Sequence, residues 1–451
     1  MTGDDDPRSS SLTQRGRETA TAPLRTYVIA PFGETEPVGR VPQGRLDEAV
    51  GLARAIDLDV VGQGAVRMQH PRPATLIGKG KVDEIAQIVA RDDIGLVVVD
   101  APLSPAQQRN LERAWKVKVL DRTGLILEIF GERARTREGT LQVELAHLNW
   151  QKTRLVRSWT HLERQRGGYG FLGGPGETQL EADRRIIQER ITRIERELES
   201  VRRTRGLHRE SRRRVPYPIV ALVGYTNAGK STLFNRLTRA DVMAEDQLFA
   251  TLDPTLRGIA LPHGGTAILS DTVGFISDLP PHLVAAFRAT LEEVTEADVV
   301  LHVRDVAHPE TSAQAEDVAH ILASLEIDAK DRRRVVEVWN KIDLLDAEQR
   351  RERENRAARL PEDERPALVS AVTGEGLDGL VATIDQRLLR GRTQRHVMID
   401  PADGKALNWV YERCNVLARH DDSETGRISL DVLVPTRRLA EFDERFPAVQ
   451  E

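Results

Sequence analysis

The sequence is poor in cysteine and in long apolar runs. Its one cysteine, Cys414, excludes a disulfide framework and a thiolate metal site. No run of about 18 apolar residues occurs, and the N-terminal stretch MTGDDDPRSS has no apolar core, so neither a membrane span nor a secretory signal is predicted. We therefore expect a cytoplasmic protein without a disulfide partner. Peripheral association with a membrane is left open.

The 451 residues exceed what one hydrophobic core usually serves, so two to four domains are expected. The net charge of −5 does not favour a nucleic-acid partner, but the charge is unevenly distributed. Residues 150–214 contain 17 Lys and Arg against 9 Asp and Glu. Such a basic segment is a candidate contact for a polyanion, and a solvated helical face is the alternative interpretation.

The first 130 residues divide into a tail and a domain. Residues 1–24 are polar and without periodicity, which indicates a disordered tail. Residues 25–130 alternate short apolar strands with helical patterns, which is typical of a small α/β domain with a parallel sheet. The expected strands are 26–30, 60–68, 94–100 and 116–121, and the expected helices include 46–56 and 82–90.

Residues 131–214 contain two stretches of heptad-spaced apolar residues, 141–162 and 187–201. The glycine-rich loop GGYGFLGGPGETQLE at 167–181 separates them. This pattern predicts a basic, antiparallel two-helix arm that displays the loop at its tip. A structural coiled coil with a flexible loop is the alternative. We expect a monomer, although the heptads also allow pairing between chains.

A second α/β pattern covers residues 215–392, and a small α+β module is expected at 393–451. In the module we expect a strand, a helix, a strand and a short helix. The expected strands of the larger domain are 219–224, 266–274, 299–306, 335–343 and 367–372.

The first of these strands runs into GYTNAGKST, a P-loop followed by a helical pattern. Gly224 and Gly229 let backbone N–H groups curl around phosphates, Lys230 reaches the β- and γ-phosphates, and the Ser231 hydroxyl ligates Mg²⁺. The predicted phosphate-binding residues also include Tyr225, Thr226, Asn227, Ala228 and Thr232.

Three further motifs follow in order at strand ends. DTVG places Asp271 near the metal and the Gly274 N–H near the γ-phosphate. In NKID, the Asp343 carboxylate can accept from the N1–H and the exocyclic amine of guanine, and adenine lacks that amine. The third motif is Ser370-Ala371-Val372, whose backbone can receive the base O6. The other predicted contacts are Thr272, Val273, Asn340, Lys341, Ile342, Ser370, Ala371 and Val372. Together the motifs predict a P-loop domain that binds GTP and GDP.

The loop FATLDPT offers Thr251 and Thr255 as the metal ligand that senses the γ-phosphate, and we favour Thr251. The predicted metal ligands are therefore Ser231 and Thr251. Lys230, Thr251 and Gly274 are the predicted catalytic groups. The remaining candidate nucleotide contacts in this loop are Phe249, Ala250, Leu252 and Asp253.

Phe275 follows DTVG, where well-known GTPases place a glutamine that orients water. Because a phenyl ring cannot orient water, we expect slow intrinsic hydrolysis and a partner or another residue that completes the site. Simple packing of Phe275 beneath the loop predicts the same kinetics.

The chain from about Tyr27 resembles the HflX-type ribosome-associated GTPases. The most specific marks are LIGKGKVDEI (76–85), LSPAQQRNLE (103–112), the segment 121–148 and GGYGFLGGPGETQLEADRR (167–185). The resemblance implies a GTPase that binds the large ribosomal subunit through rRNA and splits or rescues stalled ribosomes under stress. It also implies that the N-terminal domain and the arm reach toward the peptidyl-transferase region, where Tyr169 and Phe171 can stack on bases or pack within the hairpin.

Two alternatives remain open at this point. The chain can be a GTP-gated regulatory switch that binds RNA or protein without stimulation by ribosomes. The resemblance also implies a second alternative, an ATP-dependent RNA remodeller that acts through the N-terminal domain, for which the candidate here is Gly78-Lys79-Gly80-Lys81. This tetrapeptide lacks the P-loop pattern, so we favour a contact with rRNA phosphates there.

Overall fold

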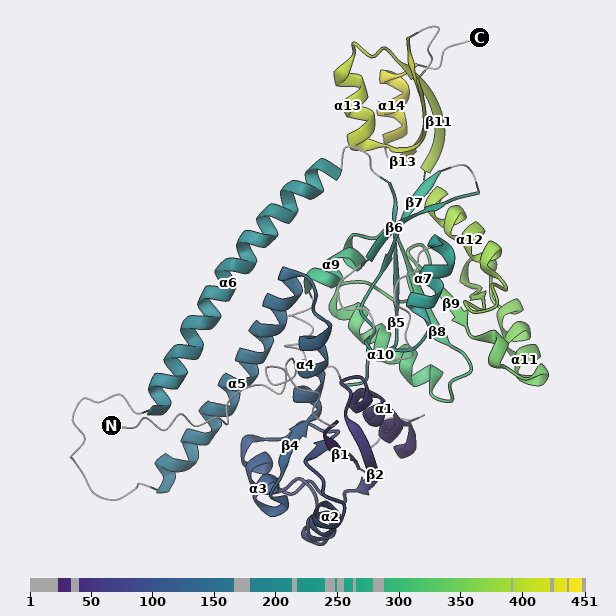
Figure 1. Ribbon diagram of the computed structural model, residues 1–451. Helices are drawn as coiled ribbons and strands as arrows, with labels where there is room; N and C mark the ends of the chain where they lie inside the picture. The colour runs from purple at the N-terminus through teal and green to yellow at the C-terminus, as the bar shows by residue number, and fades with distance from the viewer. Residues whose placement is uncertain are drawn as a thin grey trace. The chain divides into compact units, whose positions relative to one another are not determined.

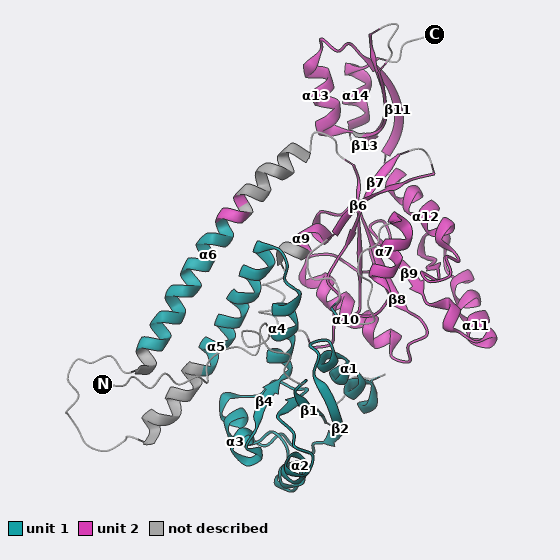
Figure 2. Cartoon of the chain, viewed as in Figure 1, with its two compact units in different colours: residues 1–199, 246–252, 279–287 teal, residues 200–245, 253–278, 288–451 magenta. Residues whose placement is uncertain are grey.

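The computed structural model places the chain in two compact units. Unit 1 comprises residues 1–199, 246–252 and 279–287, and unit 2 comprises the rest (Figure 2). The structure describes residues 23–33, 40–165, 179–212, 217–239, 248–249, 255–262, 265–278, 288–390, 392–421, 426–435 and 438–447.

A four-stranded parallel sheet with the strand order β2-β1-β3-β4 forms the N-terminal part of unit 1 (Figure 1). This arrangement confirms the predicted parallel α/β domain. Its strands are β1 (Arg25–Phe32), β2 (Asp59–Arg67), β3 (Leu96–Val99) and β4 (Lys118–Asp121). Its helices are α1 (Pro42–Arg54), α2 (Lys79–Arg91), α3 (Pro105–Trp115) and α4 (Arg122–Arg133).

Local sequence explains where these elements lie. All four residues of β3, LVVV, are buried, as expected for a central strand covered on both faces. Helix α3 begins with a capping box, in which Ser104 and Gln107 bond each other's backbone N–H, and Pro105 stands in the first turn. Helix α4 was not expected as a separate element. It begins where the Asp121 side chain accepts from the Gly124 N–H.

Unit 1 also contains most of a two-helix arm, formed by α5 (Arg137–Gln165) and the first part of α6 (Gln179–Arg212). Three contacts join the helices: Arg137 with Glu197 at 3.7 Å, Glu144 with Arg190, and Lys152 with Gln188 at 2.5 Å. The partner numbers fall along α6 as they rise along α5, so the helices are antiparallel, as predicted. The loop residues 166–178, with Tyr169 and Phe171, lie outside the described residues.

Unit 2 is built on a six-stranded sheet with the order β10-β9-β8-β5-β7-β6. All neighbouring pairs are parallel except β6 with β7. The strands are β5 (Ile219–Gly224), β6 (Thr255–Ala260), β7 (Thr266–Asp271), β8 (Val299–Asp305), β9 (Val335–Asn340) and β10 (Ala367–Leu368). The helices are α7 (Lys230–Thr238), α9 (Arg288–Glu296), α10 (Thr311–Ser324), α11 (Ala347–Ala358) and α12 (Leu377–Leu389), with short 3₁₀ turns at Ile342–Leu344 and Glu362–Glu364.

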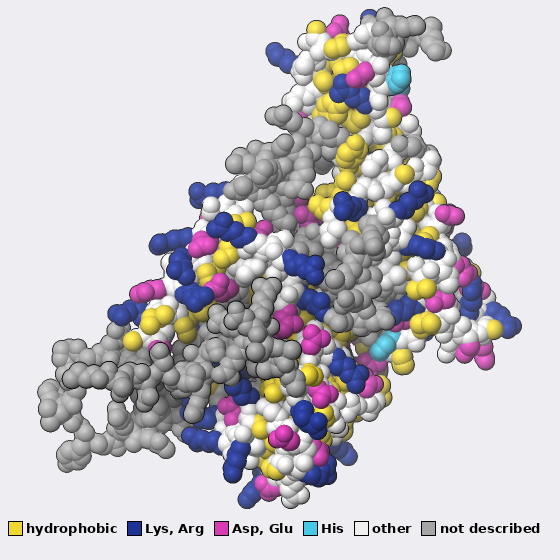
Figure 3. Space-filling view, in the orientation of Figure 1, with side chains coloured by type: hydrophobic (Ala, Val, Ile, Leu, Met, Phe, Trp, Pro, Cys, Tyr) yellow, Lys and Arg dark blue, Asp and Glu magenta, His cyan; other side chains and the backbone are white. Residues whose placement is uncertain are grey.

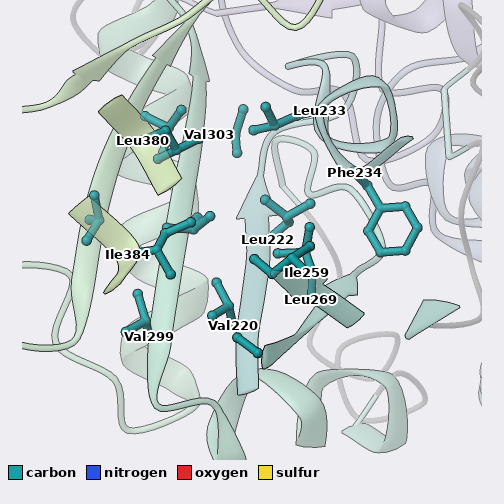
Figure 4. Close-up of a cluster of buried hydrophobic side chains, with 14 of the residues drawn as sticks. Val220, Leu222, Leu233, Phe234, Ile259, Leu269, Val299, Val303, Leu380 and Ile384 are labelled. Atoms are coloured by element: carbon teal, nitrogen blue, oxygen red, sulfur yellow. The ribbon is translucent and has the colours of Figure 1, made fainter. Parts of the chain in front are cut away.

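Apolar side chains from the strands and from two helices form the core of this sheet (Figure 4). Val220 and Leu222 of β5 are fully buried, and Phe234 of α7 and Leu380 of α12 belong to the same cluster. Burial of β5 on both sides explains its continuous apolar run, IVALV. The core therefore fixes the strand whose end becomes the P-loop.

The C-terminal module is a three-stranded antiparallel sheet, β11-β13-β12, with two helices. Strand β12 is an addition to the expected strand–helix–strand–helix order. The aromatic core of the module is formed by Trp409, Phe442 and Phe446. Its elements are β11 (Arg392–Ile399), α13 (Gly404–Arg413), β12 (Asn415–Asp421), β13 (Ile428–Pro435) and α14 (Leu439–Arg445). Within the part of the chain that the structure describes, no helix is long and apolar enough to span a membrane.

Candidate functional site

The predicted nucleotide-binding motifs meet at one edge of the six-stranded sheet. Strand β5 ends at Gly224, β7 at Asp271 and β9 at Asn340. These strands and β8 run parallel, so their carboxyl ends lie at the same edge. In open α/β sheets this edge is where ligands bind. The tertiary structure therefore brings together the P-loop, DTVG and NKID.

Two glycines allow the P-loop to lie close to its neighbours. Gly224 has φ 155°, and a Cβ there would lie 2.2 Å from the Val303 carbonyl oxygen. Gly229 has φ 91°, and its Cβ would lie 2.3 Å from Asn340 Nδ2. Both positions exclude any side chain. The loop then enters α7 at Lys230, and a helix N-terminus directly after a glycine-rich loop is the geometry that the predicted phosphate cradle requires.

Lys230 is 6% exposed, and its Nζ donates to the Tyr225 carbonyl oxygen at 2.8 Å. A Cβ on Gly274 would lie 3.1 Å from the same Nζ, so these two predicted catalytic residues are neighbours. Burial lowers the pKa of the Lys230 ammonium to about 8, against the attraction of Asp271, which raises it. An ammonium has three N–H donors, so this cation is well suited to donate hydrogen bonds to phosphate oxygens.

Ser231 and Asp271, 40 residues apart in the chain, form a hydrogen bond. The Ser231 hydroxyl donates to Asp271 Oδ2 at 2.7 Å, and Asp271 is fully buried. A hydroxyl beside a carboxylate is the oxygen donor set that Mg²⁺ prefers. Elsewhere in the described ranges, no group of three or more His, Cys, Asp or Glu can hold a metal ion. Thr251, with Ala250, Leu252 and Asp253, lies outside the described residues.

The DTVG turn is fastened to the P-loop by main-chain hydrogen bonds. The Thr226 N–H donates to the Phe275 carbonyl at 2.7 Å, and the Phe275 N–H donates to the Gly224 carbonyl at 3.1 Å. The Tyr225 hydroxyl accepts from the Ser277 N–H at 2.8 Å, a partner that sequence reasoning missed. Phe275 is 1% exposed, so its ring is buried.

Asn340 joins two loops of the site. Its Nδ2 donates to the Ala228 carbonyl at 2.8 Å, and its Oδ1 accepts from the Ala371 N–H at 3.0 Å. The side chain is 1% exposed. We predicted a nucleotide contact at this position, and the structure adds a role that no local motif reveals: the amide ties the P-loop to the third predicted motif, 370–372.

The rest of NKID lies at the predicted base-binding position. Lys341 Nζ pairs with Asp305 Oδ2 at 2.8 Å, and Ile342 is buried. Asp343 is exposed, so its carboxylate is accessible to a base. Asp305 was missed in the sequence, although its place at the end of β8, beside β9, was a usable signal.

The last predicted motif forms a tight turn after β10. The Ser370 hydroxyl accepts from the Thr373 N–H at 3.1 Å, and the Ser370 carbonyl accepts from the Gly374 N–H at 2.9 Å. Val372 is 70% exposed, whereas Ser370 and Ala371 are buried.

Two other candidates lie in unit 1. Helix α2 begins at Lys79, directly after Gly78, and Lys81 Nζ pairs with Glu84 Oε1 at 2.7 Å. Phe249, predicted as a nucleotide contact, is buried among residues of unit 1.

Family models match most of the chain. From the N-terminus they are described as GTP-binding GTPase N-terminal (43–131), GTP-binding GTPase Middle Region (133–212), 50S ribosome-binding GTPase (219–341) and HflX C-terminal domain (357–451).

Curated relatives match over similar lengths. The GTPase HflX of Magnetococcus marinus is 49% identical, with 89% of this chain and 90% of the relative covered. The GTPase HflX of Escherichia coli is 48% identical, with 81% of this chain and 84% of the relative covered. Among solved structures, the SsGBP–GDP complex is 25% identical, covers 80% of this chain and 98% of its own, and has a TM-score of 0.47.

Replacing Asn340 with alanine should weaken GDP binding by about ten-fold or more. The substitution removes both bonds that hold the two loops and leaves a buried N–H and a buried C=O unpaired. Titration calorimetry with GDP measures the effect. Asn355→Ala, on the exposed face of α11, is the matched control. Unchanged affinity in folded Asn340→Ala would refute the bridging role.

GDP affinity should fall by about ten-fold between pH 7 and pH 9. Phosphate binding favours the charged ammonium of Lys230, so its pKa is higher in the complex than in the free protein. Affinity is therefore fully present well below pH 8 and falls as pH rises through the free pKa of about 8. Binding measured at constant ionic strength checks this, and a flat profile to pH 9 would contradict it.

Asp343→Asn should weaken GTP binding by about 100-fold, because the carboxylate that accepts two base N–H groups becomes a mixed donor and acceptor. Xanthosine triphosphate, which has an oxygen in place of the exocyclic amine, should bind the variant better than GTP does. Competition between the two nucleotides measures the selectivity, with exposed Glu348→Gln as control. Retained preference for guanine would disprove the assignment.

Proposed function

Because this chain belongs to the HflX family of GTPases, we propose that it is a GTP-driven switch that binds the large ribosomal subunit. The chain is a GTPase and binds GTP and GDP. The model matched by residues 219–341 is described as a 50S ribosome-binding GTPase, which supports a ribosomal partner. The proposed setting is the cytoplasm, where the switch splits or rescues stalled ribosomes under stress.

The observation that carries the ribosomal partner is the arginine-rich face of α6. Arg184, Arg185, Arg193 and Arg196 line an open hollow of about 620 Å³ together with Gln188, Glu189 and Thr192. The four arginines are exposed, and dark blue side chains gather along this part of the molecule in Figure 3. Clustered guanidinium groups bind phosphate oxygens in bidentate fashion, and RNA presents them in regular rows.

Mg²⁺ fits the oxygen donors of the nucleotide site. Ser231 would hold the ion directly, together with Thr251 from the loop, and Asp271 would hold it through water. The bound ion neutralises charge that develops on the transferred phosphate. The fit rests on the buried pair of Ser231 and Asp271, two oxygen donors that the fold holds 2.7 Å apart.

The chain's own residues bind and orient the phosphates. The buried Lys230 ammonium neutralises the β- and γ-phosphates, and the Gly274 N–H donates to the γ-phosphate. The Phe275 ring supplies no hydrogen bond to the attacking water, so hydrolysis is slow without a partner. A ribosomal group that orders the site or orients the water accelerates the reaction, and hydrolysis then releases the switch.

Purified 50S subunits should stimulate GTP hydrolysis strongly, by about 10-fold or more, and rising salt should abolish the stimulation. Phosphate release is measured with and without subunits, and Lys230→Ala should be inactive in both. A protein that binds GTP but shows no stimulation would replace this proposal with a GTP-gated regulatory switch.

The same assay tests the arginine face. The triple variant Arg184→Gln, Arg193→Gln, Arg196→Gln should require more 50S subunit for half-maximal stimulation, by about ten-fold, and should show a weaker salt dependence. The control triple Arg257→Gln, Arg333→Gln, Arg351→Gln removes equal charge from exposed positions of unit 2. Equal behaviour of the two triples would place the rRNA contact elsewhere.

A further inference from the structure

The end of strand β8 places a carboxylate beside NKID. Strand β8 is parallel to β9, and the register of the two strands pairs Asp305 with Asn340, the first residue of the motif (Figure 1). The Val306 N–H donates to the Asn340 carbonyl at 3.1 Å, so the two main chains stay joined beyond the last strand pair. Backbone hydrogen bonds therefore hold Asp305 next to the segment that begins with Lys341.

Both oxygens of the Asp305 carboxylate have partners. Its Oδ1 accepts from the N–H groups of Ala307 at 3.0 Å and His308 at 3.2 Å, which closes a turn directly after β8. Its Oδ2 pairs with the Lys341 Nζ at 2.8 Å. The side chains of Asp305 and Lys341 are only 14% and 29% exposed, so water screens this ion pair less than one on an open surface. One oxygen organises its own loop, and the other restrains Lys341.

The backbone of Lys341 lies in the left-handed region, with φ 66°. A residue with a side chain occupies this region at a cost, and it stays there where surrounding contacts determine it. Lys341 directly precedes the 3₁₀ turn Ile342–Leu344, which carries Asp343. The direction in which this turn leaves β9 therefore depends on the conformation of Lys341.

We propose that Asp305 is a positioning residue for guanine recognition. It anchors the Lys341 ammonium, maintains the left-handed backbone of Lys341, and thereby fixes the Asp343 carboxylate before a base arrives. An acceptor that is already ordered loses less conformational entropy on binding. Asp305 acts through Lys341 and does not contact the nucleotide. This inference deepens the proposed function and rests on Asp343 as the acceptor for guanine.

The consequence concerns the base and not the phosphates. Guanine offers both its N1–H and its exocyclic amine to a carboxylate, whereas hypoxanthine offers the N1–H alone. GDP and inosine diphosphate carry the same ribose and the same two phosphates, so the contribution of the P-loop cancels when their affinities are compared. The ratio of the two affinities therefore reports how well Asp343 is placed.

The test measures the affinities of the full-length chain for GDP and for inosine diphosphate by titration calorimetry. Asp305→Asn keeps an oxygen for the N–H groups of Ala307 and His308 but removes the charge that holds Lys341. It should lower the ratio of GDP affinity to inosine diphosphate affinity by about five-fold, because the exocyclic amine loses a well-placed charged acceptor. A change in stability alone would weaken both nucleotides equally.

A second variant examines the same ion pair from its other side. Lys341→Met keeps the apolar stem of the side chain and removes the ammonium, so it should lower the ratio as Asp305→Asn does. The double variant should have no lower a ratio than Lys341→Met alone, because both substitutions remove one interaction. Additive effects in the double variant would show that Asp305 does not act through Lys341 and would contradict the proposal.

Asp328→Asn is the matched control. The Asp328 Oδ1 accepts from the Lys330 N–H at 2.8 Å in another turn of unit 2, so the substitution makes the same chemical change in a turn away from NKID. This control should leave the ratio unchanged. A ratio lowered as much by Asp328→Asn as by Asp305→Asn would argue against a specific role of Asp305.

Asp343→Ala separates the positioning role from the role of Asp343. A lowered ratio in Asp343→Ala without one in Asp305→Asn would overturn the positioning role alone. An unchanged ratio in Asp343→Ala would disprove Asp343 as the acceptor and the inference with it. Equal losses of GDP and inosine diphosphate affinity in Asp305→Asn would reduce Asp305 to a structural residue.

Discussion

The nucleotide site depends on one buried amide. Asn340 donates to Ala228 in the P-loop and accepts from Ala371 in the turn after β10, so two loops separated by more than a hundred residues share one side chain. Gly229 provides the space, since any Cβ there would collide with the same amide. The phosphate cradle and the turn proposed to hold the base are thereby fixed relative to each other. Both ends of a guanine nucleotide can then be held by a preorganised site.

Close main-chain contacts also hold the residues predicted to be catalytic. The DTVG turn is bonded to the P-loop through Thr226 and Phe275, which places Gly274 beside the Lys230 ammonium. Burial makes that cation easier to deprotonate, and Asp271 partly offsets the effect. The same burial strengthens its attraction for phosphate, because water does not screen it. The Lys230 ammonium and the Gly274 backbone are therefore already in place to bind a phosphate. Phe275, in contrast, has no group that can orient water.

The chain divides its functions among its parts. The six-stranded sheet carries the nucleotide motifs, and α6 carries the arginine face proposed for rRNA.

The sequence by itself determined the parallel sheets, the antiparallel arm and the order of the nucleotide motifs. Apolar strands that end in glycine or acidic residues are local patterns, and their spacing reflects local geometry. The sequence did not reveal β6 or β12. Both segments mix polar and apolar residues, and they form strands because they pair with β7 and β13. Only the tertiary structure decided that Asn340 bridges two loops, that Asp305 pairs with Lys341, and that Phe249 packs on Phe130. These partners are distant in the chain, and no local periodicity encodes which side chains meet once the strands align.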